Sequence, residues 1–248
     1  MSSEKSLSRT IQQSSSSPKY DHQKWETKRK FLRFLIRVIG FKLLAKLEYV
    51  EGLQNVPAEG PAILMINHIA FIDPIVVLHV LPRNIVPMAK IEVYDYPFIG
   101  IFPKFWGVIP VHREEFDRRA VQTALEVLRA GEIILIAPEA TRSEKLQQGK
   151  EGIAYIANRA DVPVIPVAIE GTPGFPAFRT SARWNKSGVT VHFGQPFKFH
   201  NQNHRPDRQQ LRLMTDEALF QLAKYLPDER RGYYSNLDKA TQETIELI

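Results

Sequence analysis

A histidine and an aspartate separated by four residues are the side chains in this sequence best suited to acid–base chemistry. They lie in the run NHIAFIDP at residues 67–74, as His68 and Asp73. Histidine is a natural general base because an unperturbed imidazole titrates near neutral pH. If the chain turns into a helix at Asp73, its carboxylate returns to one ring nitrogen and leaves the other free to accept a proton. The spacing therefore predicts a base and the residue that orients it.

A structural interpretation of the same residues stays open at this point. Asp73 followed by Pro74 is also a favourable helix start, with a capping residue and a proline in the first turn. A lone histidine is compatible with a hydrogen-bonded core residue, and one His-x4-Asp pair is not specific.

Two further polar clusters come near the ends of apolar runs. Residues 137–143 read APEATRS, and residues 107–113 read GVIPVHR and end on Arg113. Lys104 and Lys150 are isolated cations nearby in the sequence. Arginine suits phosphate because its planar guanidinium donates two parallel hydrogen bonds. Each charge alone is also compatible with a solvated surface, or with a local Glu–Arg pair of little energetic consequence.

The elements that must position these residues alternate along the chain from Tyr49 onwards. Buried strands are predicted over residues 61–66, 84–89, 133–137, 162–169 and 189–193. Helices are predicted over residues 74–80, 116–130, 152–159 and 207–225. The alternation indicates an α/β sheet covered by helices. Folds of this class bind ligands beyond the carboxyl ends of their strands. The Pro-rich region from Pro82 to Pro110 is predicted to be extended and looping.

The chain divides into four predicted parts. Residues 1–24 are polar and Ser-rich and are expected to be disordered. Residues 25–48 form a basic amphipathic helical segment, residues 49–226 the α/β domain, and residues 227–248 a polar C-terminal helix and tail.

The segment 25–48 predicts contact with a membrane surface. Between residues 28 and 47 it carries seven basic residues and no acid among many apolar ones, with Lys30, Arg33 and Arg37 on one helical face. Gly40 predicts a break into two short helices or one kinked helix. Basic amphipathic helices are typical of interfacial anchors. The alternative is a helix that packs its apolar face on the domain. No uninterrupted apolar run approaches the roughly 18 residues of a spanning helix.

Composition narrows the classes of partner. The net charge of +6 and pI near 9.4 indicate an anionic partner: nucleic acid, an anionic lipid surface or a phosphorylated small molecule. The chain has no cysteine, which excludes disulfides, thiolate metal sites and a cysteine nucleophile. No nucleic-acid recognition motif is present, so no nucleic-acid partner is expected. No residue cluster has the spacing of metal ligands, so no metal is expected.

Together these blocks resemble the glycerolipid acyltransferase family, and within it the 1-acylglycerol-3-phosphate acyltransferases. Family motifs occur in family order across residues 60–170. The matching segments are Asn67-His68-x4-Asp73, Gly107–Arg113, Pro138-Glu139-x-Thr141-Arg142-Ser143, the run 162–167, and Lys150 with Gly152. Ala140 departs from the family's usual glycine and Ala137 from its usual aromatic residue, while Pro110 and His112 depart from an apolar residue and an acid. If position 140 requires positive φ, alanine is strained there.

The resemblance implies a mixed, largely parallel sheet covered by helices, and O-acyl transfer to the sn-2 hydroxyl of 1-acylglycerol-3-phosphate, giving phosphatidic acid. His68 would be the base and Asp73 its orienting residue. The acyl donor would be a thioester of coenzyme A or acyl carrier protein, with no other cofactor. The expected substrate-binding residues are Asn67, Lys104, Arg113, Glu139, Thr141, Arg142 and Lys150. Glu139 would bind a glycerol hydroxyl or orient Arg142. The enzyme would be a peripheral or monotopic protein on the cytoplasmic face of a phospholipid membrane.

Three alternatives remain. The same chemistry could act on another acceptor, such as glycerol-3-phosphate or another lysophospholipid. The chain could be an inactive lipid-binding homologue, although His68 and Asp73 are intact. A nucleic-acid-binding protein is the alternative of a different class.

Overall fold

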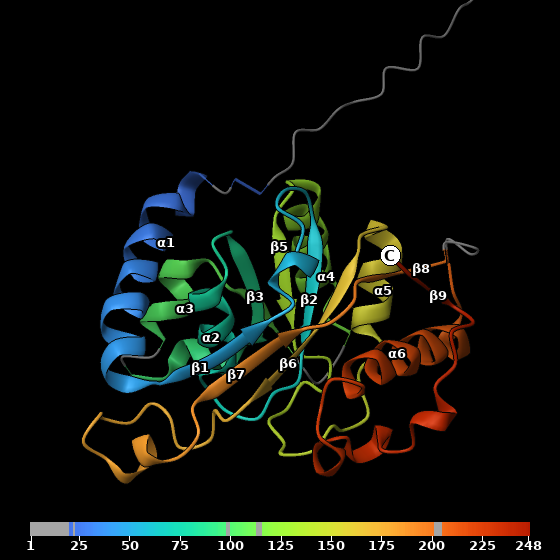
Figure 1. The fold of residues 1–248 in the computed structure, drawn as a ribbon. Coiled ribbons are helices and arrows are strands. Elements are labelled where there is room, and N and C mark those ends of the chain that lie inside the picture. Colours follow the sequence, from blue (N-terminus) through green and yellow to red (C-terminus); the bar gives the residue numbers. More distant parts are fainter. Residues whose placement is uncertain (1–19, 22, 98–99, 113–115, 201–204) are drawn as a thin grey trace, which may run out of the picture.

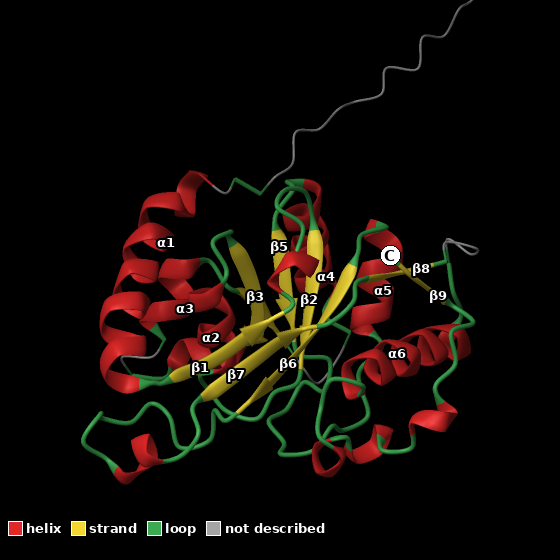
Figure 2. Cartoon of the chain, viewed as in Figure 1, coloured by secondary structure: helices red, strands yellow, loops and turns green. Residues whose placement is uncertain are grey.

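A twisted, mostly parallel sheet lies between two layers of helices (Figures 1 and 2). The computed structural model describes residues 20–21, 23–97, 100–112, 116–200 and 205–248. The strands in this part of the chain are β1 (Leu47–Glu51), β2 (Ala62–Ile66), β3 (Ile85–Lys90), β4 (Ile109–Val111), β5 (Ile133–Ile136), β6 (Val164–Glu170), β7 (Val189–Phe193), β8 (Phe197–Phe199) and β9 (Ile245–Leu247). Their order is β1-β7-β6-β2-β5-β3-β4, with β8 pairing to β6 and β9.

Strand direction explains where the site is formed. β2 runs parallel to β5 on one side and to β6 on the other, and β3 runs parallel to β5 and β4. β7 and β8 pair with β6 in the antiparallel sense. The carboxyl ends of β2, β5 and β6 therefore meet at one edge of the sheet. This arrangement confirms the predicted mixed, largely parallel sheet.

Both faces of the sheet centre are covered. The helices are α1 (Gln23–Leu35), α2 (Asp73–Val80), α3 (Ile101–Trp106), α4 (Arg118–Arg129), α5 (Gly152–Ala160) and α6 (Arg208–Ala223), with a π-helix over Ile36–Leu44. Ile63 and Met65 of β2 face the core beneath α4, α5 and α6, while Leu64 and Ile66 face the core beneath α2. Burial on both faces explains the continuous apolar runs of the central strands.

The five predicted strands are confirmed as β2, β3, β5, β6 and β7, and the four predicted helices as α2, α4, α5 and α6. α4 begins where the Asp117 side chain accepts hydrogen bonds from the backbone N–H groups of Arg119 and Ala120. α6 begins with a reciprocal capping box between Asp207 and Gln210.

The region from Pro82 to Pro110 is more regular than predicted. It contains α3 and β4. Pro103 is in the first turn of α3, where a missing N–H costs little. Gly107 ends the helix in the left-handed region, at φ 76°, and donates to the Pro103 carbonyl. A Cβ at Gly107 would lie 2.7 Å from the Trp25 ring, so the glycine also permits α1 to pack there.

The N-terminal helix differs from the prediction in the place and kind of its irregularity. It starts at Gln23 and changes from α to π winding at Ile36, before Gly40. The Ala45 N–H donates to the Gly40 carbonyl, five residues back, as π geometry requires. The predicted Ser-rich tail lies almost entirely outside the described residues.

The C-terminal part was wrongly predicted as a polar helix. Short 3₁₀ turns at Asp228–Arg230, Gly232–Tyr234 and Leu237–Lys239 are followed by β9. Tyr234 is fully buried, and its hydroxyl donates to Asp216 of α6 at 2.8 Å. Packing on α6 and pairing with β8 set this backbone, and neither is visible in local composition.

Among the residues that the structure describes, no helix has the length and apolar character needed to cross a bilayer.

Candidate active site

His68 and Asp73 form a hydrogen-bonded pair at the carboxyl end of β2, with the aspartate fully buried and the histidine partly exposed. The loop after Ile66 leads directly into α2, whose first residue is Asp73. His68 Nδ1 lies 2.9 Å from Asp73 Oδ2, with the carboxylate fully buried and 16% of the imidazole side chain exposed. Because an ionised carboxylate only accepts hydrogen bonds, we assign the proton to Nδ1. Nε2 is then left with a lone pair for an incoming proton.

The chain between these two residues is held by the same carboxylate oxygen. Asp73 Oδ2 also accepts hydrogen bonds from the backbone N–H groups of Ile69, at 2.6 Å, and Ala70, at 2.8 Å. These bonds close the loop onto the start of α2. The imidazole is thus oriented by a carboxylate that is itself fixed by the backbone.

Asn67 has a different role from the predicted substrate contact. Its amide donates to the Ile169 carbonyl at 2.9 Å and accepts from the Ile169 N–H at 2.8 Å. The side chain is buried, so it joins β2 to β6 directly before the histidine. It is a positioning residue.

Glu139 fixes the backbone on both sides of the site. Its buried carboxylate accepts from the Gln147 N–H at 2.7 Å and from the His68 N–H at 3.3 Å. Burial raises the pKa of Glu139 to about 7, against the lowering effect of these two hydrogen bonds. The predicted contact with Arg142 is not among the interactions of the described residues. Glu139 instead holds the loop after β5 against His68.

The loop after β5 brings three predicted cationic or hydroxyl side chains to the same edge of the sheet. The Ser143 N–H donates to the His68 carbonyl at 2.8 Å, and the Lys150 N–H donates to the Pro138 carbonyl at 2.8 Å. Ala140 adopts φ 55°, the left-handed conformation that the expected glycine would have taken freely. Thr141, Arg142 and Lys150 have exposed side chains beside this backbone.

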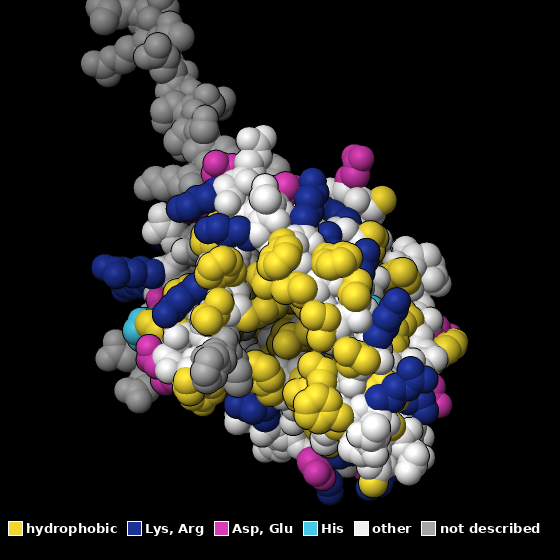
Figure 3. Space-filling model, turned by 90° about the vertical axis from the view of Figure 1, so that its left-hand side faces the viewer, with side chains coloured by type: hydrophobic (Ala, Val, Ile, Leu, Met, Phe, Trp, Pro, Cys, Tyr) yellow, Lys and Arg dark blue, Asp and Glu magenta, His cyan; other side chains and the backbone are white. Residues whose placement is uncertain are grey.

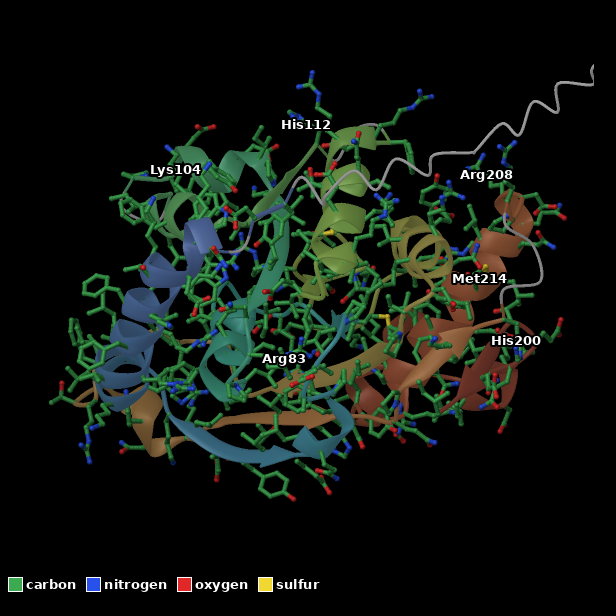
Figure 4. All side chains as sticks on the ribbon, turned by 90° about the horizontal axis from the view of Figure 1, so that it is seen from above. Arg83, Lys104, His112, His200, Arg208 and Met214 are labelled. Atoms are coloured by element: carbon green, nitrogen blue, oxygen red, sulfur yellow. The ribbon has the colours of Figure 1, made fainter. Side chains whose placement is uncertain are left out.

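Two predicted substrate cations are not placed at this site. Lys104 lies on α3 beside α1 (Figure 4). Trp106 of the same helix donates to the Ile85 carbonyl at the amino end of β3, the end of the parallel sheet opposite His68. Lys104 therefore lies away from His68 and the loop after β5. Arg113 lies outside the described residues.

Comparison with known proteins agrees with this geometry. A family model described as acyltransferase matches residues 49–170. The chain is 30% identical over 182 residues to the 1-acyl-sn-glycerol-3-phosphate acyltransferase of Bacillus subtilis, covering 73% of this chain and 88% of that protein. The chain belongs to the acyltransferase family. Like that relative, it is an O-acyltransferase.

Further similarity supports the same family. A 1-acyl-sn-glycerol-3-phosphate acyltransferase of Borreliella burgdorferi is 32% identical over 130 residues, covering 51% of this chain and 52% of that protein. The crystal structure of the 1-acyl-sn-glycerophosphate acyltransferase PlsC from Thermotoga maritima aligns with a TM-score of 0.57 at 25% identity. That alignment covers 77% of this chain and 78% of the other.

Two residues that the sequence analysis did not select lie near the same edge of the acyltransferase sheet. Glu170 ends β6, one residue beyond Ile169, and Arg230 comes from the C-terminal turns. Arg230 Nε donates to Glu170 at 3.3 Å, and its guanidinium donates to the Glu144 carbonyl at 3.2 Å. Burial raises the pKa of Glu170, the arginine opposes that effect, and the Asp73 carboxylate adds to it. No motif marks either residue, because their contact depends on how the C-terminal segment folds back.

In the described part of the acyltransferase, no three His, Asp or Glu side chains are grouped so that they could hold a metal ion.

Proposed function

We propose that the enzyme transfers a fatty acyl group from a thioester to the sn-2 hydroxyl of 1-acylglycerol-3-phosphate at a membrane surface. The main support for this reaction is the 2.9 Å contact between His68 Nδ1 and Asp73 Oδ2, which leaves Nε2 available to accept a proton. The names of the bacterial relatives support this acceptor.

The proposed transfer is direct. The acceptor hydroxyl gives its proton to His68 Nε2 as its oxygen attacks the thioester carbonyl. The tetrahedral intermediate then expels the thiolate, which takes the proton from the imidazolium. Asp73 stabilises that imidazolium and keeps the ring oriented. No side chain becomes acylated. Proton transfer to His68 is expected to accelerate the reaction by about 10²- to 10⁴-fold.

The acceptor phosphate is assigned to the exposed cations of the loop after β5. Arg142 and Lys150 are exposed and lack ion-pair partners among the described residues. The Ser143 N–H to His68 carbonyl bond places Arg142 one residue from a direct contact with the catalytic segment. A planar guanidinium binds phosphate in a bidentate manner.

Membrane association is assigned to the outer face of α1 and the π-helix. This face exposes Phe31 (61%) and Phe34 (59%), followed by Val38, Ile39 and Leu43. Figure 3 shows apolar side chains gathered around a hollow on this side of the molecule, with Lys and Arg side chains around them. A bilayer surface with anionic headgroups matches both properties.

Only part of the basic charge in this segment is available to lipid. Arg29 is fully buried and donates to the Trp106 carbonyl at 2.8 Å. Arg33 donates to the carbonyls of Pro82 and Arg83 at 3.0 and 2.9 Å. These two arginines dock α1 onto the domain. Lys28, Arg37 and Lys42 are exposed and are the proposed lipid-facing charges, while exposed Lys30 pairs with Glu26 at 2.9 Å.

The acceptor is tested by the release of free thiol from acyl-coenzyme A and from acyl-carrier-protein thioesters. We expect release with 1-acylglycerol-3-phosphate and much less with monoacylglycerol, which lacks the phosphate. Arg142→Gln should raise KM for the phosphorylated acceptor about tenfold or more, the effect of losing a charge-assisted bond.

Arg159→Gln is the matched control, an exposed arginine in the last turn of α5, away from the site. Equal KM values for Arg142→Gln and Arg159→Gln would contradict the phosphate assignment. Better turnover of glycerol-3-phosphate or of another lysophospholipid would replace the acceptor while retaining the chemistry.

A further inference from the structure

The loop between β6 and β7, residues 171–188, is attached to the end of the N-terminal helical segment. The Ala177 N–H donates to the carbonyl of Leu44, the last π-helix residue, at 2.7 Å. The Val189 N–H donates to the Lys46 carbonyl at 2.7 Å. In Figure 1 the loop extends beneath the same side of the molecule that carries α1. The two segments are thus neighbours although they are far apart in sequence.

The conformation of this loop is fixed by its own side chains. Arg183 donates to the carbonyls of Pro173 and Ser187 at 2.8 Å each, and to that of Gly171. Its guanidinium also stacks on the ring of buried Phe175, 3.9 Å from the centroid. The Trp184 indole N–H donates to the Ala177 carbonyl at 2.8 Å. The loop is therefore held in a defined conformation by contacts of its own side chains.

This loop exposes an aromatic ring to solvent. Phe178 is 73% exposed, more than any other large apolar side chain that the structure describes. Arg179 beside it and Lys186 are also exposed. Residues 171–188 contain three basic side chains and no acid. An exposed ring on a positively charged loop is suited to contact with a lipid bilayer, whose interior is apolar and whose headgroups are anionic.

We propose that Phe178 and Arg179 form a second contact with an anionic lipid bilayer, continuous with the apolar face of α1 and the π-helix. The inference rests on the proposed membrane association and adds to it a segment beyond the region matched by the family model. Because α1 is docked onto the domain, contact along this helix alone would leave the whole domain able to tilt about the helix axis. A second contact from the loop that follows Glu170 would set the tilt of the active-site edge relative to the lipid.

The test is sedimentation of the full-length protein with two kinds of vesicle, phosphatidylcholine alone and phosphatidylcholine mixed with phosphatidylglycerol. Phe178→Ser should weaken partitioning onto the anionic vesicles about tenfold or more, as expected for a ring that no longer enters the apolar layer. Arg179→Gln should weaken binding to the anionic vesicles and leave binding to the neutral ones unchanged.

Phe116→Ser is the matched control, since Phe116 is 60% exposed and its ring contacts Tyr155 of α5 on the other side of the sheet. Thermal unfolding of each variant verifies that it is folded. Equal vesicle binding by Phe178→Ser and Phe116→Ser would overturn the inference.

Two other results separate the inference from the function on which it rests. If the wild type itself fails to bind anionic vesicles, the proposed membrane association fails together with this second contact. If Phe178→Ser instead converts a dimer to a monomer in gel filtration, the ring belongs to an interface between two copies of the chain, which would also overturn the inference.

Discussion

Ala140 lies in the left-handed region of backbone conformation, at φ 55°. A residue with a Cβ is disfavoured there by about 1–2 kcal/mol, whereas glycine is not. We expect Ala140→Gly to raise the free energy of unfolding by about 0.5–1 kcal/mol, after allowance for the greater freedom of glycine in the unfolded chain. Urea denaturation measures this change.

Ala130→Gly is the control, because Ala130 has φ −76° and relieves no strain when replaced. The strain argument would fail if Ala140→Gly were no more stable than Ala130→Gly.

The buried Glu139 carboxyl predicts a pH-dependent stability. Its pKa of about 7 in the folded protein exceeds the value of about 4.3 for an unfolded glutamate. The folded state therefore binds the proton more tightly, and this contribution is complete below about pH 4.3 and lost as the pH rises through about 7. Over that window the free energy of unfolding should fall by an amount on the order of 1–3 kcal/mol.

Glu139→Gln cannot titrate and should lack this decrease, although it also loses one backbone contact. Urea unfolding at several pH values compares the two slopes. Identical slopes in wild type and variant would show that the carboxyl does not titrate in this range.

Residue roles were predictable where the partners are close in sequence. His68 and Asp73 meet because the chain needs only one loop and a helix start to bring them together. Glu139 was selected as a site residue, but its backbone partners His68 and Gln147 became visible only in the fold. Glu170 and Arg230 were missed because their contact joins a strand end to a distant turn.

At the scale of elements, the junction of β2 and β6 depends on Asn67. Its amide forms both a donor and an acceptor bond with the Ile169 backbone in a buried position. We expect Asn67→Ala to lower the free energy of unfolding by about 2–3 kcal/mol, because it leaves buried backbone groups unpaired. KM for the acceptor should remain near the wild-type value in the folded fraction.

Chemical denaturation and steady-state kinetics on the same preparation separate the two roles of Asn67. A raised KM with unchanged stability would restore the substrate contact that its sequence position suggested.

Strands with a continuous apolar run, or with the alternating pattern of β7, were predicted, and the other strands were not, including β1, whose five residues are at most half-buried. β2, β5 and β6 are buried on both faces, so their sequences are continuous apolar runs. β4, β8 and β9 have three residues each and exist through their pairing partners. α3 has six residues, too few for a helical period to emerge.

At the scale of the whole molecule, the segment proposed to contact lipid and the pair of His68 and Asp73 are connected through α2. The Phe41 ring of the π-helix stacks on His79 at the end of α2, with 3.8 Å between ring centroids. Asp73 begins the same helix. If α1 contacts a bilayer as proposed, this packing links that contact to the helix that begins at Asp73, and the second contact at Phe178 would fix the tilt.

Salt should weaken membrane attachment of the wild type. Each lysine or arginine near an anionic leaflet contributes about 1 kcal/mol, and the Debye length falls from about 10 Å at 0.1 M salt to about 3 Å at 1 M. We expect the bound fraction on anionic vesicles to decrease across this range, and deletion of residues 1–48 to reduce it further. If neither treatment changes the bound fraction, residues 25–48 are not the anchor.

The central claim is that His68 is the general base of an acyl transfer to a lysophospholipid. The most direct test is thiol release from an acyl thioester by purified protein with 1-acylglycerol-3-phosphate in detergent micelles. It compares wild type, His68→Ala and the control His192→Ala, which removes a half-exposed histidine of β7 paired with Glu51.

We predict release that requires the acceptor, a loss of about 10²- to 10⁴-fold in His68→Ala, and near-wild-type rates in His192→Ala. A folded His68→Ala variant that keeps wild-type activity would contradict the account.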